Sequence, residues 1–196
     1  MEPCVAPQSF TQVVKPSPIR PAQWHTVVAN QRTLAPHWLQ PWLTDKGSLT
    51  RALQAYAGDG FNVLMTQQGW QRVFADEAQC LNIRPQSQAV VREVELRNHT
   101  QALVCARTVI PLNTYRKHQT IFRGLGNRSI GEWLFTNPAI HRGPIQVHCF
   151  NPTTQLWGRR SLFYIDRAPL MVCEIFLPAF TQGLNSCTPS LPNSQR

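Results

Sequence analysis

Three ionisable side chains interrupt apolar strand patterns and are the strongest candidates for chemistry. They are Arg92, Arg107 and Glu174, in the segments 89–97, 102–110 and 170–177. Successive side chains of a strand point to opposite faces, and this alternation places each of the three among apolar neighbours. A buried guanidinium or carboxylate needs a partner of opposite charge, which either the protein or a ligand can supply.

These charges allow two main interpretations. Arg92 and Glu174 could form a structural ion pair with Arg107 at its rim, or the three could surround a ligand that carries carboxylates. Exposure at a sheet edge is a third, weaker interpretation. The strand pattern alone favours neither of the first two.

Two helix starts favour the ligand site. Ser48 and Ser129 each precede an apolar residue and suit the N-cap position of a helix. Leu49 and Ile130 then occupy the first helical position, where the backbone N–H has no partner within the helix and can bind an anion. Either helix alone would be an ordinary capped helix. Together with the two arginines, the helix starts indicate a pocket for a small organic acid.

The elements that must position these residues form an α+β fold. Apolar residues at helical spacing predict a helix over Ser48–Ala57. Strand-like segments joined by hairpin turns predict a single domain with an antiparallel sheet of about six strands, and helices gathered on one side or end. The six strand segments are 61–67, 89–97, 102–110, 145–150, 159–165 and 170–177.

The length of 196 residues fits one domain with a substantial core. We expect a partly ordered leader rich in Pro and Gln over 1–33, the domain over 34–180, and a flexible polar tail over 181–196. No run of eighteen apolar residues occurs, so no membrane span is expected. The N-terminus lacks the apolar segment of a signal peptide, which favours a cytoplasmic location.

The formal charge of +9 attracts anions, which include nucleic acids, membrane surfaces and small acidic substrates. The basic and aromatic segment 157–160 could contact nucleic acid. No helix-turn-helix or stacking platform accompanies it, so nucleic-acid binding is a minority interpretation.

Cysteine and histidine spacing gives no indication of a metal site. The six cysteines include no C-x-x-C pair, and His141 and His148 lack helical spacing and an acidic partner. We interpret Cys105, Cys149 and Cys173 as small buried hydrophobic residues, with a catalytic cysteine as a lesser alternative.

The same residues carry a resemblance to a known family. Segments in the order WLTDKGSLTRALQ, VREVELRNHTQALVCARTVIP, RSIGEWLF, LWGRRS and LMVCEIFLP resemble the signature segments of chorismate pyruvate-lyases. The similarity runs from Trp42 to Pro178, whereas the leader and tail have no recognised counterpart and residues 112–124 align poorly.

The resemblance implies a single α+β domain whose site is enclosed by helical flaps, with no metal and no organic cofactor. It implies that Arg92 binds the ring carboxylate of chorismate, with the backbone amides of Leu49 and Ile130, and that Glu174 lies near the ring hydroxyl. By the same resemblance, Arg107 receives the enolpyruvyl carboxylate.

The implied reaction splits chorismate into 4-hydroxybenzoate, a precursor of quinone rings, and pyruvate. The resemblance also favours a monomer. The alternative is a domain of the same fold that senses small acids without turning them over. Such sensors normally follow a DNA-binding segment, and the region before Trp42 is short and rich in proline.

Overall fold

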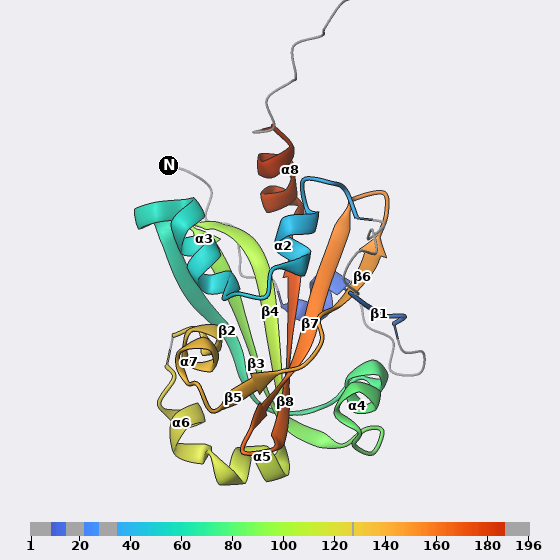
Figure 1. Cartoon of the computed structure of the whole chain (residues 1–196), viewed down its shortest axis with the longest axis vertical. Coiled ribbons are helices and arrows are strands. Elements are labelled where there is room, and N and C mark those ends of the chain that lie inside the picture. The colour runs from blue at the N-terminus through green and yellow to red at the C-terminus, as the bar shows by residue number, and fades with distance from the viewer. Residues whose placement is uncertain (1–8, 15–21, 28–34, 127, 187–196) are drawn as a thin grey trace, which may run out of the picture.

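An antiparallel sheet of eight strands forms the centre of the computed structural model, which describes residues 9–14, 22–27, 35–126 and 128–186. The strand order is β1-β6-β7-β8-β4-β3-β2, and β5 pairs with β7 beside this path (Figure 1). The six long strands are β2 (Phe61–Arg72), β3 (Gln88–Asn98), β4 (Gln101–Pro111), β6 (Gln146–Asn151), β7 (Leu156–Ile165) and β8 (Ala168–Phe176). They correspond to the six predicted segments, and the two short strands β1 (His25–Thr26) and β5 (Ile140–Arg142) are additional.

Two tight hairpins connect the central strands. The β3–β4 turn pairs Asn98 with Gln101, and the β7–β8 turn pairs Ile165 with Ala168, so each loop has two residues. Asp166 and Arg167 both have positive φ, as the right-handed twist of such hairpins demands. The predicted α+β class and antiparallel sheet are therefore confirmed.

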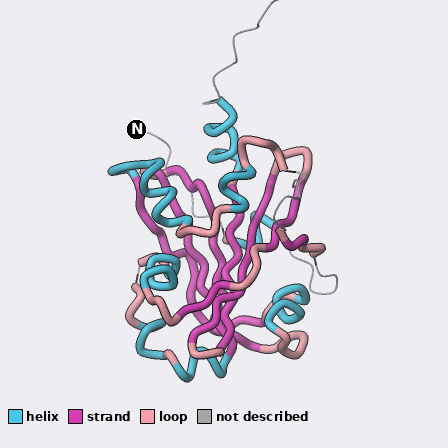
Figure 2. Tube along the Cα trace, in the orientation of Figure 1, coloured by secondary structure: helices cyan, strands magenta, loops and turns pink. Residues whose placement is uncertain are grey.

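Helices cover both faces of the sheet, rather than one side or end alone (Figures 1 and 2). On one face lie α2 (Gln40–Thr44), α3 (Leu49–Ala57), α6 (Gln119–Arg123) and α7 (Ile130–Thr136), and a 3₁₀ turn, Gly58–Gly60, follows α3. The other face is covered by α1 (Phe10–Val14) and α4 (Ala75–Leu81). The short α5 (Leu112–Lys117) follows β4, and α8 (Pro178–Ser186) follows β8.

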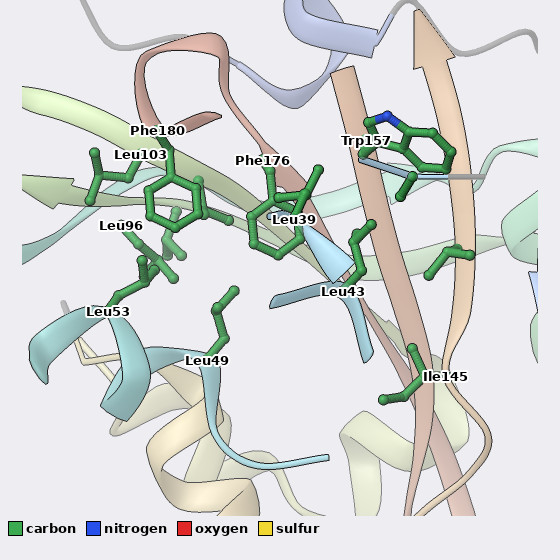
Figure 3. Close-up of a cluster of buried hydrophobic side chains, with 14 residues drawn as sticks. Leu39, Leu43, Leu49, Leu53, Leu96, Leu103, Ile145, Trp157, Phe176 and Phe180 are labelled. Atoms are coloured by element: carbon green, nitrogen blue, oxygen red, sulfur yellow. The ribbon is translucent and has the colours of Figure 1, made fainter. Parts of the chain in front are cut away.

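The face under α2 and α3 has an apolar cluster that fixes the position of α3. Leu49 and Leu53 of α3 pack with Leu43, Leu96 and Phe176 (Figure 3). Leu43, Leu53 and Phe176 are fully buried. Burial of such side chains stabilises the fold by about 1.5–3 kcal/mol each, so the helix start at Leu49 is firmly tied to the sheet.

The ordered domain extends further at its C-terminal end than predicted. The tail was expected to begin at residue 181, but α8 continues to Ser186 and Thr181 is only 3% exposed. The reason is that Phe180 packs on Trp42 and Phe176 at ring distances of 4.8 and 5.9 Å. Residues 187–196 and most of the predicted leader lie outside the described residues, although Phe10 of the leader is buried.

No helix in the described ranges is long and apolar enough to cross a membrane. Within the same ranges, no group of three or more His, Cys, Asp or Glu side chains could hold a metal ion.

Cys105 and Cys173 are buried, as predicted, and they lie in the apolar cluster under α1 and α4. Cys149, which was also predicted to be buried, is only half-buried. Burial raises the pKa of Cys105 to about 12, and burial also raises the pKa of Cys173 well above its usual value.

Both buried thiols should resist iodoacetamide at pH 8 in the folded protein, because the thiolate is the reactive form. Mass spectrometry of the peptides that carry Cys105 and Cys173, with and without urea, measures this protection. Equal labelling rates in the folded and unfolded protein would contradict the burial of these thiols.

Candidate active site

A small enclosed pocket lies between the sheet and the N-terminal ends of α3 and α7. The strands contribute Arg92, Val94, Leu96, Ala106, Thr108, Val172 and Glu174, and the helices contribute Leu49, Thr50, Ser129, Ile130, Gly131 and Phe135. The pocket volume of about 20 Å³ is room for roughly one water molecule. A ligand with a six-membered ring therefore fits only after the helices or the side chains that line the pocket move.

Arg92 lies on the pocket face of β3 and is only 2% exposed. Its guanidinium donates to Gln68 Oε1 at 2.6 Å and to the carbonyls of Gly126 and Arg128 at 2.7 and 2.9 Å. All of these acceptors are neutral, and the buried Nε has no hydrogen-bond partner. Burial lowers the pKa of Arg92 from its ordinary value, so an anionic ligand would relieve an unfavourable environment.

Glu174 lies on the same face of the sheet, on β8, and pairs with Arg159 rather than with Arg92. Arg159 Nε donates to Glu174 Oε2 at 2.6 Å. The structural ion pair between Arg92 and Glu174, one of the two main interpretations of the sequence, is therefore wrong. The register explains the difference, because Glu174 stands opposite Ala106 and Arg159, and β4 separates its strand from that of Arg92. Two strand spacings are about 10 Å, too far for direct contact but suitable for a ligand between the two side chains.

The helix starts at Leu49 and Ile130 are confirmed. Ser48 accepts a hydrogen bond from Arg51 N–H at 3.4 Å, and Ser129 accepts one from Gly131 N–H at 3.1 Å. Leu49 and Ile130 thus stand at the first helical positions, both beside the pocket, where their amides have no acceptor within the helix.

A hydrogen bond joins the two helices across the pocket. The hydroxyls of Thr50 in α3 and Ser129 at the start of α7 are 2.7 Å apart, and both residues are buried. The two helices therefore close the pocket as a connected pair.

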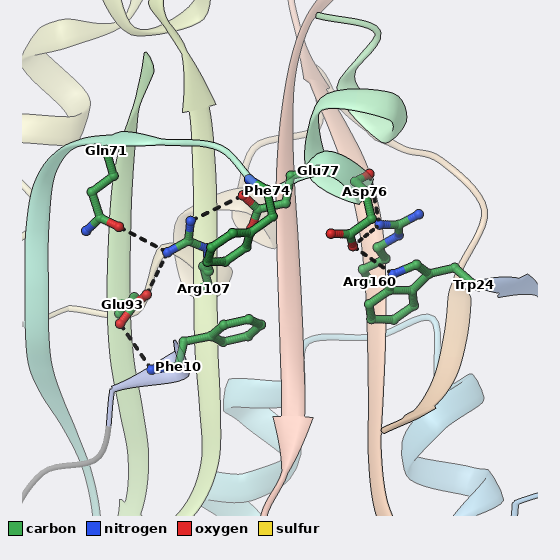
Figure 4. Close-up of polar contacts among 9 residues, drawn as sticks. All are labelled: Phe10, Trp24, Gln71, Phe74, Asp76, Glu77, Glu93, Arg107 and Arg160. Atoms are coloured by element: carbon green, nitrogen blue, oxygen red, sulfur yellow. Dashed lines mark hydrogen bonds and ion pairs between the residues drawn. The ribbon is translucent and has the colours of Figure 1, made fainter. Parts of the chain in front are cut away.

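Arg107 is not part of this pocket. Its guanidinium lies on the opposite face of the sheet, where it donates to Glu77 Oε1 and Glu93 Oε1, both at 2.7 Å (Figure 4). It also lies 4.3 Å from the centre of the Phe74 ring. Burial opposes its charge, but the two carboxylates outweigh burial and raise the pKa of Arg107.

A bulge in the β3–β4 hairpin accounts for this position of Arg107. The register shifts by one residue between Leu96 and Arg97, so that Arg107 faces Glu93 and Arg92 faces Thr108. Without the shift, the turn pairing would place Arg107 opposite Arg92. A shift of one residue moves a side chain to the other face of a sheet.

Comparison with known proteins identifies the family. A sequence model described as chorismate lyase matches residues 20–184. The chain belongs to the chorismate lyase family.

Curated relatives agree with this family. The probable chorismate pyruvate-lyase of Methylococcus capsulatus is 39% identical over 154 residues, which cover 72% of this chain and 95% of the relative. The probable chorismate pyruvate-lyase of Nitrosomonas eutropha is 37% identical over 177 residues, covering 83% of this chain and 97% of the relative.

Solved structures show a more distant likeness. The effector domain of PhnF from Mycobacterium smegmatis has a TM-score of 0.45 at 11% identity, covering 67% of this chain and 88% of that chain. A ligand-binding domain of a putative GntR-family regulator from Bordetella bronchiseptica has a TM-score of 0.41 at 14% identity, covering 61% and 86%.

Two arginines beside the pocket of this chorismate lyase family member were missed by the sequence analysis. The sequence analysis interpreted Arg159 only as part of a basic and aromatic segment. Strand alternation over 156–165 places Arg159 and Arg160 on opposite faces of the sheet, and Arg160 pairs with Asp76 at 2.9 Å. Arg142, at the end of β5, donates from Nε to Ser161 Oγ at 3.0 Å. A single arginine in a strand of three residues leaves no pattern in the sequence.

Proposed function

We propose that this chain is a chorismate pyruvate-lyase, which eliminates pyruvate from chorismate and releases 4-hydroxybenzoate. The observation that carries the proposal is Arg92, a buried cation with neutral partners and an unused Nε at a pocket whose other end holds Glu174. Membership of the chorismate lyase family supports the same reaction.

In this proposal, Arg92 holds the ring carboxylate, assisted by the amides of Leu49 and Ile130. Glu174 orients the hydroxyl at the opposite end of the ring, and Arg159 fixes the Glu174 carboxylate by a hydrogen bond of 2.6 Å. Arg107 has no direct role in this scheme, because its contacts lie on the other face of the sheet.

The chemistry suits such a site. Loss of the hydrogen at C4 and of the enolpyruvyl ether at C3 makes the ring aromatic, so the reaction has a strong intrinsic driving force. The protein mainly has to orient the ether and stabilise the negative charge that moves onto the departing enolpyruvate. The proposal includes a cytoplasmic monomer that works without a metal or organic cofactor and supplies a quinone ring precursor.

The test is an assay of purified protein with chorismate in the presence of EDTA. 4-Hydroxybenzoate is followed by absorbance and pyruvate by a coupled reaction. Equal amounts of both products would support the lyase. Binding of chorismate without release of pyruvate would indicate a sensor of small acids instead of an enzyme. If the protein neither binds chorismate nor turns it over, the proposed site is wrong.

The hydrogen bond between Thr50 and Ser129 should slow product release, because the helices must separate before a ring can leave. Thr50→Val keeps the shape of the side chain and removes the hydrogen bond. We expect dissociation of 4-hydroxybenzoate, measured by stopped-flow fluorescence, to become about 2- to 10-fold faster.

Thr136→Val is the matched control, because the Thr136 hydroxyl bonds only to carbonyls within α7. Dissociation rates that change equally in the two variants would refute the role of the interhelical bond.

A further inference from the structure

Arg142 lies beside the pocket and has no carboxylate partner among the described residues. Its Nε donates to Ser161 Oγ at 3.0 Å, and its Nη1 faces the carbonyls of residues 45–47 at 3.1 to 3.5 Å. The contacts to the carbonyls of Asp45 and Gly47 are longer than an ordinary hydrogen bond, and a neutral carbonyl binds a guanidinium less strongly than a carboxylate does. An anionic ligand would therefore bind the guanidinium more strongly than these carbonyls do.

The surroundings of Arg142 are apolar on two sides. Its guanidinium carbon lies 5.5 and 5.4 Å from the ring centres of Phe135 and Phe163. Burial lowers the pKa of Arg142, although Glu174 partly offsets this effect. The environment of Arg142 thus resembles that of Arg92, since both cations are desolvated and neither has an ion-pair partner in the described ranges.

The charges on this face of the sheet suit a dianion. Arg92, Arg142 and Arg159 are opposed by Glu174, which leaves two uncompensated positive charges next to the pocket. The nearby Asp45 carboxylate is exposed, accepts from Gly47 N–H at 2.9 Å, and acts on Arg142 less strongly than Glu174 does. Chorismate carries two carboxylates, whereas 4-hydroxybenzoate carries one.

The position of Arg142 matches the second carboxylate. Its partner Ser161 stands opposite Val172, a residue of the pocket wall, and lies on β7, three strands from the strand of Arg92. Three strand spacings are about 14 Å, which places Ser161, and the Arg142 guanidinium bonded to it, beyond Glu174 on the side of the pocket away from Arg92. If Arg92 holds the ring carboxylate, the enolpyruvyl ether lies next to the ring hydroxyl at the end that contains Glu174.

We propose that Arg142 binds the enolpyruvyl carboxylate of the substrate, exchanging its contacts with the loop 45–47 for the ligand. The inference rests on the proposed function and adds the residue that distinguishes substrate from product. Arg142 releases its ligand when pyruvate leaves, whereas Arg92 keeps the carboxylate that remains on the ring.

Arg142→Gln and Arg142→Lys test this assignment, with the exposed Arg167→Gln as the control for a change in net charge. We expect Arg142→Gln to lower kcat/KM for chorismate by roughly 10- to 100-fold. The Kd for 4-hydroxybenzoate, measured by tryptophan fluorescence, should change by less than about 3-fold. Arg142→Lys should recover part of kcat/KM, because it keeps the positive charge.

A parallel loss of chorismate turnover and 4-hydroxybenzoate affinity would overturn the proposal and make Arg142 a support for the loop. Unchanged values of both would also overturn it. If the parent protein releases no pyruvate, the proposed function fails. The assignment of Arg142 is then judged by equilibrium binding of chorismate, which should weaken in Arg142→Gln while 4-hydroxybenzoate binding stays.

Discussion

Arg92→Ala is expected to lower kcat/KM for chorismate by about 30- to 5,000-fold, which corresponds to a loss of about 2–5 kcal/mol of binding to a buried carboxylate. The reason is that Arg92 is a desolvated cation with an unused donor at the pocket. Binding of 4-hydroxybenzoate should weaken by a similar factor, because the ring carboxylate is common to substrate and product. Steady-state kinetics and fluorescence titration measure the two effects.

The fold should survive this change, because Arg92→Ala leaves only neutral acceptors behind, namely Gln68, the Met65 sulfur and two backbone carbonyls. Arg84→Ala, at an exposed position, controls for the lost charge. A folded Arg92→Ala protein with turnover close to that of the parent would disprove the role of Arg92.

Arg107→Ala is expected to reduce the free energy of unfolding by about 3–5 kcal/mol, because it leaves the carboxylates of Glu77 and Glu93 buried without a cation. Both carboxylates are about 3% exposed, so water cannot replace the guanidinium without opening the structure. Urea unfolding followed by circular dichroism measures the loss.

The double variant Arg107→Ala with Glu93→Gln should be more stable than Arg107→Ala alone, since one of the two uncompensated charges is gone. If the Arg107→Ala protein is as stable as the parent but has no turnover, Arg107 binds the substrate, as the family resemblance implies. The two substitutions are thus expected to change different properties. Arg92→Ala should reduce catalysis, and Arg107→Ala should reduce stability.

The sequence predicts the strands well because their signal is local. Alternation in each segment is visible without knowing its neighbours, and all six long strands follow from it. The helix starts at Leu49 and Ile130 are predictable for the same reason, since an N-cap serine and the residue after it are adjacent in the chain.

The partners of the charges were not predictable, because they depend on strand order and register. The pairing of Glu174 with Arg159 requires β7 and β8 to be neighbours, which the hairpin between them predicts. It also requires Arg92 to be two strands away from Glu174, and the hairpin does not predict that distance. The face of the sheet on which Arg107 lies depends on the β-bulge opposite Leu96, where β4 has one extra residue. No local sequence pattern marks that bulge.

Arginines hold both of the segments that lead into α3 and α7 by donating to main-chain carbonyl oxygens. Arg159 donates to the carbonyls of Trp42 and Asp45 before α3. Arg92 donates to the carbonyls of Gly126 and Arg128 before α7. Every amino acid supplies the same oxygen, so these attachments place no demand on residue identity in the two segments. Other contacts still constrain two positions, because the Trp42 ring packs on Phe180 and Gly126 has a positive φ. An insertion or deletion in either segment would displace the oxygens and detach the segment. The exposed positions Asp45, Lys46 and Arg128 are suitable places to randomise side chains at fixed length when altered substrate preference is sought.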